Sequence, residues 1–97
     1  MIYHIAHEGS WITAMDTGFY EHPSIIKEGF IHTCSQSQIA GVRKRYYDGI
    51  INLTLLNIDE SLVSSMIKYE LSPSVNEIFP HIYGPLNTDA VAKIEII

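Results

Sequence analysis

Cysteine is almost absent from this 97-residue sequence, and so are the segments that would direct a chain to a membrane or out of the cell. The single cysteine, Cys34, excludes an internal disulfide and a four-thiolate zinc site. No apolar run approaches the length of about 18 residues that a membrane-spanning helix needs, and the first residues lack the basic and apolar regions of a secretory signal. We therefore expect a cytoplasmic protein with no membrane partner.

Permanent positive charge is also scarce, because six lysines and arginines stand against eleven aspartates and glutamates, a net charge of −5. This balance excludes a general affinity for nucleic acid, so any contact with phosphate has to be local. Half of the cations, Arg43, Lys44 and Arg45, crowd one predicted helix end. There they are typical of a solvated face that complements the helix dipole, and binding to a phosphate is the alternative interpretation.

Hydrophobic residues make up 46% of the chain and charged residues only 18%, which is typical of a folded globule rather than a disordered chain. A chain of this length forms a single domain, residues 1–97, with no linker. Segment 50–58 is aliphatic throughout, which predicts a central strand covered on both faces. Ser35 and Gln38 have the spacing of a capping box at the start of a helix.

The periodicity of apolar residues predicts an α+β domain with five to six short strands and two main helices. Trp11 and Met15, at positions i and i+4, are expected to form the buried stripe of the first helix. In the last strand, alternation predicts that Ala92, Ile94 and Ile96 are buried. The predicted strands are 1–6, 30–34, 50–58, 66–71 and 90–97, with a short strand or bulged loop at 79–85, and the predicted main helices are 8–17 and 35–48.

Histidine is the residue in excess, with five in a chain that has only six permanent cations. Three of them, His4, His32 and His81, lie in apolar strand-like segments, whereas His7 and His22 lie beside glutamates and are expected at the surface. The ordinary interpretation of any one of the three is a buried imidazole satisfied by a backbone carbonyl or a hydroxyl. Three in one small domain favour a shared cleft.

Metal binding and thiol chemistry are weaker interpretations of the same side chains. The three histidines form no His-x-His or His-x-x-x-His pair, so no metal site is expected. Cys34 shares a predicted strand face with His32, but such side chains are about 7 Å apart, which is too far for direct proton transfer. Cys34 is therefore expected to pack as a small hydrophobe. The sequence leaves three roles open for Glu70, which are a general base, a ribose-binding acid and an exposed strand residue.

The block Phe79-Pro80-His81-Ile82-Tyr83-Gly84-Pro85-Leu86, together with several shorter blocks, resembles the domain of unknown function 952 family across essentially the whole chain. In this chain Thr33 stands between the Gly-Phe-Ile-His block and a Cys-Ser pair that follows that block directly in family members. The resemblance implies a fold similar to the ADP-ribosyltransferase superfamily, with a split β core, and NAD or another nucleotide-like molecule as ligand. The most specific block is Phe79-Pro80-His81-Ile82-Tyr83-Gly84-Pro85-Leu86, and the others are Ile2-Tyr3-His4-Ile5 with Trp11 and Gly18, Glu28-Gly29-Phe30-Ile31-His32, Leu55-Leu56-x-Ile58-Asp59, Tyr69-Glu70 and Asp89-Ala90-Val91.

The resemblance also implies which residues form the site. Tyr3 and His4 look like an early strand pair that contacts ribose or nicotinamide, and His32 with the helix capped at Ser35 looks like the second motif. His81, or Glu77 in a shifted register, holds the place of a glutamate that stabilises the ribosyl cation. We therefore expect a ribosyl or phosphoryl transferase with His32 and His81 as catalytic residues and a cofactor-binding set of Tyr3, His4, Trp11, Ser35 and Tyr83.

Two alternatives from other functional classes stay open. One is a non-catalytic interaction module whose histidines are structural, which an exposed aromatic patch of Phe19, Tyr20 and Tyr83 without a cleft would favour. The other is a metal-binding protein. The sequence leaves the oligomeric state open.

Overall fold

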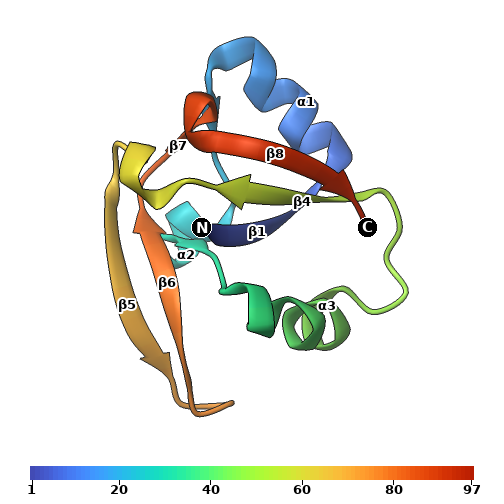
Figure 1. Ribbon diagram of the computed structural model, residues 1–97, viewed down its shortest axis with the longest axis vertical. Coiled ribbons are helices and arrows are strands. Elements are labelled where there is room, and N and C mark those ends of the chain that lie inside the picture. The colour runs from blue at the N-terminus through green and yellow to red at the C-terminus, as the bar shows by residue number, and fades with distance from the viewer.

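Three antiparallel sheets and three α-helices make up the fold, and the computed structural model describes all of residues 1–97 (Figure 1). The expectation of an α+β domain is confirmed. None of the helices combines the length and the apolar character that crossing a membrane requires. The helices are α1 (Glu8–Thr17), α2 (Ser24–Glu28) and α3 (Ile39–Tyr47), and the strands are β1 (Ile2–His7), β2 (Phe19–Tyr20), β3 (Ile31–His32), β4 (Leu53–Ile58), β5 (Met66–Ser72), β6 (Glu77–Tyr83), β7 (Leu86–Asn87) and β8 (Val91–Ile96).

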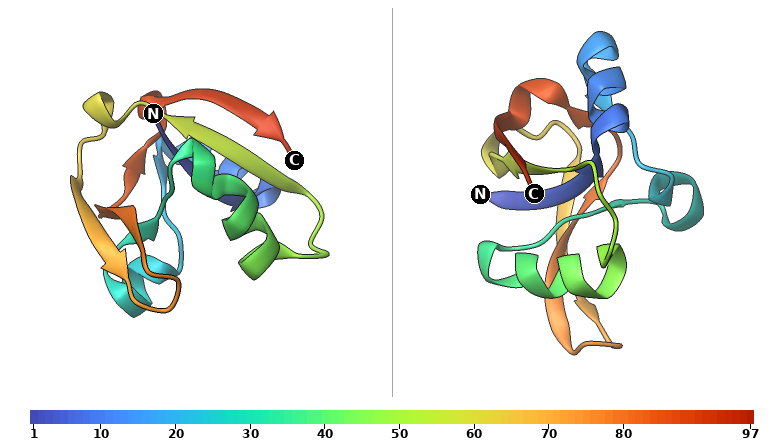
Figure 2. Two further views of the ribbon diagram at one scale, coloured as in Figure 1. Left: turned by 60° about the horizontal axis from the view of Figure 1, so that its bottom comes forward. Right: turned by 90° about the vertical axis from the view of Figure 1, so that its right-hand side faces the viewer.

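The first sheet has the order β1-β4-β8, with β4 at its centre. Every residue of β4 is buried, so the prediction of a central strand is confirmed, although Ile50 and Ile51 lie outside it and are exposed. The two faces carry different cores because side chains alternate along a strand. Leu56 packs with Trp11 and Ala14 of α1, whereas its neighbour Leu55 lies in a cluster that α3 covers. The two helices therefore lie on opposite faces of this sheet (Figure 2).

The second sheet has the order β3-β6-β5 and contains a proline in its central strand. The segment predicted as a short strand or bulged loop is a regular seven-residue strand, even though Pro80 cannot donate a backbone hydrogen bond. The Pro80 carbonyl accepts hydrogen bonds from the N–H and the hydroxyl of Thr33, at 3.2 and 2.6 Å. In an antiparallel strand the N and the C=O of one residue point to the same side, so the missing N–H faces β3 and leaves the β5 ladder complete.

Eight strands are present where five to six were expected, because β2 and β7 are two-residue strands that pair with each other. A strand of two residues has no periodicity that a sequence could reveal. The strand predicted at 30–34 is likewise reduced to Ile31–His32.

Two predicted burial patterns are wrong. On α1 the buried residues are Trp11 and Ala14, while Met15 is 62% exposed. On β8 the three residues expected to be buried are all exposed: Ala92, Ile94 at 42% and Ile96 at 89%. The period of two is correct, but β8 is an edge strand and α1 packs against β1 and β4, so the apolar face of β8 has no helix over it.

Truncating the centre of the first sheet should destabilise the protein far more than truncating a surface residue. We expect Leu56→Ala to lower the free energy of unfolding by about 2–5 kcal/mol, because Leu56 is fully buried and the change leaves a cavity. Ile26→Ala is the matched control, since Ile26 is 93% exposed, and should change it by less than about 0.5 kcal/mol. Urea denaturation measures both values. Equal losses for the two variants would contradict this description of the core.

Candidate functional site

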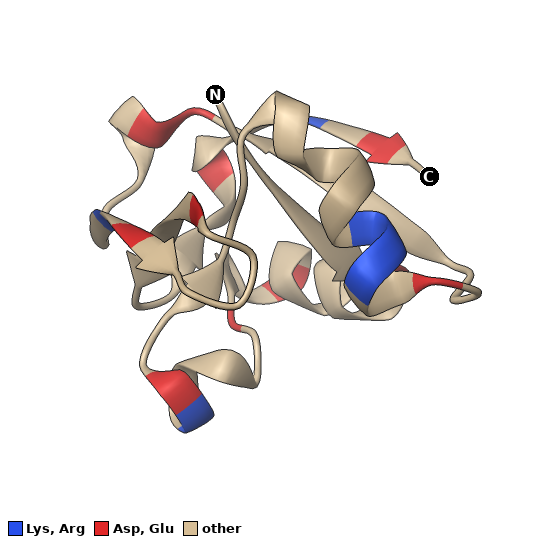
Figure 3. Cartoon of the chain, turned by 90° about the horizontal axis from the view of Figure 1, so that it is seen from below, with Lys and Arg blue, Asp and Glu red and all other residues tan.

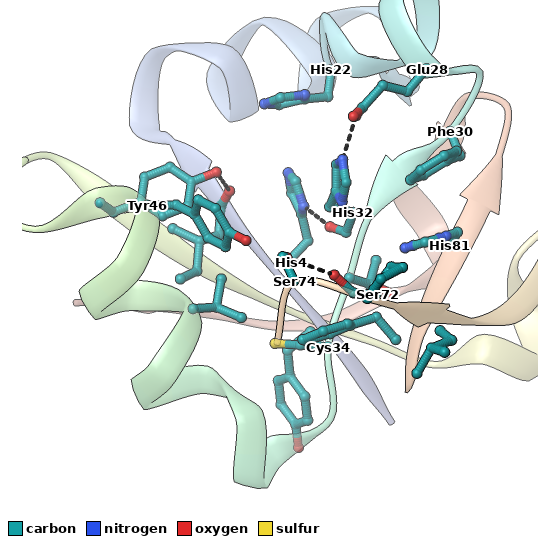
Figure 4. Close-up of a pocket in the computed structure, with 18 residues that line it drawn as sticks. His4, His22, Glu28, Phe30, His32, Cys34, Tyr46, Ser72, Ser74 and His81 are labelled. Atoms are coloured by element: carbon teal, nitrogen blue, oxygen red, sulfur yellow. Dashed lines mark hydrogen bonds and ion pairs between the residues drawn. The ribbon is translucent and has the colours of Figure 1, made fainter. Parts of the chain in front are cut away.

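A cavity of about 600 Å³ opens between α3, the start of the chain and the tip of the β5–β6 hairpin. Its volume falls in the range of small-molecule pockets, about 300–1,000 Å³. Half of its lining residues are hydrophobic. The polar lining includes four of the five histidines, which Figure 4 shows gathered from β1, the segment before α2, β3 and β6.

The three histidines that the sequence singled out converge on this pocket, as the shared-cleft interpretation predicted. His22 joins them, so its expected place at the surface is wrong, whereas His7 is exposed as expected. The Nδ1 of His22 accepts a hydrogen bond from the Ser24 N–H at 3.1 Å, which places the His22 ring 5.5 Å from that of His4. Burial lowers the pKa of His22 and favours its neutral form.

His4 is a buried imidazole with both nitrogens occupied. Its Nδ1–H donates to the carbonyl of His32 at 2.6 Å, and its Nε2 accepts from the hydroxyl of Tyr20 at 2.8 Å. The carbonyl can only accept, so this arrangement determines the tautomer. Burial lowers the pKa of His4 to about 4, which leaves the ring neutral at pH 7. His4 lines the pocket, but its nitrogens hold the fold together.

His81 is held by a carboxylate in a way that leaves one nitrogen free. Its Nδ1 lies 2.9 Å from Glu70, which also accepts a hydrogen bond from the hydroxyl of Tyr83. The hydrogen bonds from Tyr83 and His81 lower the pKa of Glu70, so the carboxylate stays ionised. With the proton on Nδ1, the lone pair of His81 Nε2 is available for a ligand. The structure therefore places Glu70, which the sequence left open, in this network.

His32 repeats the same arrangement on the neighbouring strand. Its Nε2 lies 2.5 Å from the carboxylate of Glu28, which leaves Nδ1 free. His32 and His81 are paired residues of β3 and β6, so their side chains share a face, and their ring centroids are 5.4 Å apart. Phe30 stacks on His81 at 3.9 Å and meets His32 edge-on at 4.8 Å, which restricts both rings (Figure 4).

The pocket contains no permanent cation. Glu28 is the one permanently charged residue in its lining, and no lysine or arginine is among the others. Three of the six lysines and arginines lie together on α3 instead (Figure 3). Arg43 donates to the carbonyls of Tyr47 and Ile50, so it satisfies the end of its own helix, as the dipole interpretation predicted.

Gln38 joins two walls of the pocket. Its carbonyl oxygen accepts from the N–H of Ser35 at 2.9 Å, as the capping spacing predicted. Its amide NH₂ donates across to the carbonyl of Ile78 at 2.9 Å and to the carboxylate of Glu77 at 3.3 Å. The first turn of the helical segment is therefore tied to the β5–β6 hairpin.

Cys34 is a buried structural residue, as expected. It is 2% exposed, and burial raises the pKa of its thiol to about 11, so little thiolate forms at pH 7. Its backbone N–H and C=O pair with those of Tyr3 at 2.8 Å, which connects β1 to the segment after β3. No group of three or more histidine, cysteine, aspartate or glutamate side chains is arranged to hold a metal ion.

The expected cofactor-binding residues fall into two groups. Tyr3 and His4 line the pocket. Trp11 is buried under the first sheet, Ser35 begins the helical segment, and Tyr83 reaches Glu70 from outside the lining. The structure brings His32 and His81, the expected catalytic residues, together with the first group and not with the second.

Reasoning from the sequence missed two site residues, Glu28 and His22. Each is positioned by a local turn. Gly29 has φ of 89°, a left-handed conformation that ends α2 and turns Glu28 back over His32. The spacing of four between Glu28 and His32 was the available signal. For His22 the signal was weaker, because only the start of α2 at Ser24 turns its ring inward.

The aromatic patch that would favour an interaction module is not formed. Tyr20 is 1% exposed and donates to His4, whereas Phe19 is exposed and Tyr83 is partly buried beside Glu70. A cleft is present instead.

Comparison with known proteins adds a family and a structural relative. The family model described as "Protein of unknown function (DUF952)" matches residues 5–94. A crystal structure of protein CC0527 from Caulobacter crescentus has a TM-score of 0.88 and 28% sequence identity, covering 98% of this chain and 83% of that chain. The solution NMR structure of CC0527 has a TM-score of 0.84 at 28% identity, with 99% and 83% coverage. No curated protein matches.

Replacing His4 should remove part of the acid sensitivity of folding. The pKa of His4 is about 4 in the folded protein, whereas its ordinary value is 6.5. Between these two pH values the unfolded chain binds a proton at His4 and the folded protein does not. Stability is therefore lost as pH falls from 6.5 towards 4, by about 3 kcal/mol for this group. We expect His4→Gln to be less stable at pH 7 but to lose less on acidification, as measured by urea denaturation from about pH 7 to about pH 4.5.

His7→Gln is the matched control for this experiment, because His7 is exposed. Its stability should follow the wild-type dependence on pH. A His4→Gln profile parallel to that of the wild type would show that His4 does not titrate as described.

Proposed function

The chain belongs to the DUF952 family of proteins of unknown function, so its own pocket has to carry the functional argument, and we propose that this pocket binds NAD or a similar nucleotide-like ligand. The observation that carries the proposal is the pair His32 and His81, each held by its own carboxylate and each with a free nitrogen at a cavity of about 600 Å³. Tyr3 and His4, which resemble the ribose-contacting pair of ADP-ribosyltransferases, line the same cavity. The buried free thiol of Cys34 fits the reducing cytoplasm in which we place the protein.

The charge of the pocket favours binding of the heterocycle and ribose of such a ligand in the pocket, rather than binding of its phosphates. Phosphate sites use arginine, lysine or a helix N-terminus, and the lining has neither arginine nor lysine. Burial lowers the pKa of His4 and of His22, so these two rings do not attract an anion. Phe30 and Tyr46 add aromatic surface on which a flat ring can stack. A positively charged ring, such as an oxidised nicotinamide, also gains from the carboxylate of Glu28.

The same charges favour ribosyl transfer over phosphoryl transfer. Phosphoryl transfer needs positive groups around a phosphate, whereas cleavage of a ribosyl bond leaves positive charge on a carbon that carboxylates stabilise. His81 stands where ADP-ribosyltransferases normally have a glutamate, and a neutral imidazole alone would stabilise that charge poorly. Glu70, 2.9 Å from His81, adds the negative charge from behind the ring.

In this reaction His81 acts as the general base. Glu70 holds the proton on Nδ1, so Nε2 takes the proton of the attacking hydroxyl or water. The C–N bond at the ribose breaks as the new C–O bond forms, and the heterocycle leaves with the electron pair. The Nδ1 of His32 accepts a hydrogen bond from a ribose hydroxyl, and Glu28 fixes the orientation of the His32 imidazole.

Ligand binding is tested by NMR titration with NAD, nicotinamide riboside and ATP. We expect NAD and the riboside to shift the ring signals of His22, His32 and His81 at ligand concentrations of about 1–5 mM, with ATP weaker than NAD. The signal of His7 is the internal control, because His7 is exposed and does not line the pocket. If no ligand shifts the pocket signals more than that of His7, the binding proposal fails.

Catalysis is tested by removing the carboxylate behind His81 without changing its shape. If the protein cleaves NAD, Glu70→Gln should lower turnover by about 100-fold or more and leave the affinity for NAD nearly unchanged. Glu60→Gln is the matched control, because Glu60 is an exposed carboxylate that also accepts from a tyrosine hydroxyl, that of Tyr69. Product release measured by chromatography gives the rate, and equal rates for the two variants would contradict the role of Glu70.

Replacing His32 and replacing His4 by alanine should have different effects on the stability of the protein. His32→Ala should abolish turnover while costing less than about 1 kcal/mol of stability, because the His32 side chain is 54% exposed. His4→Ala should cost several times more, since it leaves the Tyr20 hydroxyl and a backbone carbonyl without partners. Thermal unfolding measures both. A large stability loss for His32→Ala would assign His32 a structural role instead.

A further inference from the structure

The outer edge of β8 is an unpaired strand with an apolar face. β8 is the last strand of the sheet β1-β4-β8, and Figure 1 shows it along one side of the molecule. Its alternate residues Ile94 and Ile96 are 42% and 89% exposed, and the side chain of Lys93 is 68% exposed. A strand with free backbone groups and an exposed apolar face is a template for pairing with another strand.

We propose that β8 pairs with β8 of a second copy of this chain, antiparallel, about a twofold axis that passes through Ile94. A twofold axis brings the same surface of both copies together. In this register Lys93 of each copy lies directly opposite Glu95 of the other, which makes two opposite-charge pairs. Ile94 meets its own counterpart, and Ile96 lies opposite Ala92. The two three-stranded sheets then become one six-stranded sheet.

The other registers are worse for identifiable reasons. An axis through Lys93 places two lysines opposite each other, and an axis through Glu95 does the same with two glutamates. Like charges in directly opposite positions destabilise a strand pair. A shift by one residue places Lys93 opposite Ile94, so each copy turns its charged face towards the apolar face of the other. The register through Ile94 is the one that matches both charge and hydrophobicity.

β5 is the competing edge, because it has the same spacing of charges around Tyr69. Its charged side chains, however, are already engaged within the chain. Glu70 accepts hydrogen bonds from His81 and Tyr83, and the Lys68 ammonium lies 4.9 Å from the centre of the Tyr83 ring. On β8 the only ion pair of Lys93 is a 4.0 Å contact with Glu95, and the other carboxylate oxygen of Glu95 accepts from the side-chain amide of Asn57 at 2.9 Å. Lys93 is therefore free to pair across a β8 interface while one oxygen of Glu95 keeps its bond to Asn57, whereas on β5 both Lys68 and Glu70 are engaged with Tyr83.

The test is a charge exchange followed by analytical ultracentrifugation of the full chain. The wild type should dimerise as its concentration rises from about 5 to about 500 µM, the range of a small interface. Lys93→Glu should weaken the dimer by about tenfold, because it turns both opposite-charge pairs into pairs of like charge. The double variant Lys93→Glu with Glu95→Lys should restore dimerisation, since the exchanged charges are again complementary. Circular dichroism checks that each variant is folded.

Lys68→Glu is the matched control on the competing edge, and its dimerisation should equal that of the wild type. A wild type that stays monomeric at about 500 µM overturns the proposal. A dimer that Lys68→Glu weakens and Lys93→Glu does not also overturns it, because the contact would then run through β5. Failure of the charge exchange to restore the dimer overturns the register.

Discussion

The buried imidazole of His4 is the interaction on which the rest of the structure depends. One ring joins three elements: it is carried by β1, it donates to the backbone of β3 at His32, and it accepts from Tyr20 of β2. These elements belong to three different sheets, so the ring holds the sheets in one arrangement. Its neutrality is a condition of that arrangement, because a protonated ring could not accept from Tyr20. Since the bonded carbonyl belongs to His32, the same contact also fixes the backbone beneath the candidate site.

The site combines histidines and carboxylates without any lysine or arginine. Two imidazoles that share a sheet face each have a glutamate partner, one from the last residue of α2 and one from the strand β5. The glutamates fix the tautomers, and Phe30 fixes the ring planes. An arrangement of this kind offers lone pairs rather than positive charge, and our proposal of a ligand with hydroxyl groups and an electron-poor ring rests on that character. The overall charge of −5 agrees with this local character.

Local signals in the sequence predicted the elements better than they predicted what covers them. α1 has its predicted bounds because Gly18 and the apolar spacing act within a few residues, and Gln38 caps its segment for the same reason. The exposure of Ile94 depends instead on where α1 lies in space, which no local pattern contains. The three strand histidines were found because an apolar segment makes a polar residue conspicuous, but nothing in the sequence distinguishes His4, with both nitrogens occupied, from His81, with one free. That difference arises from partners 28 and 16 residues away for His4 and 11 residues away for His81.

The amide of Gln38 has a consequence for how the pocket responds to its contents. One side chain both caps a helical segment and holds the β5–β6 hairpin. The position of the hairpin and the stability of that first helical turn are therefore coupled. A molecule large enough to push the hairpin outward has to break the contact with Ile78 or fray the turn at Ser35. The helical turn at Ser35 and the β5–β6 hairpin are thereby coupled through one amide, so a change that loosens either element also removes a partner from the other.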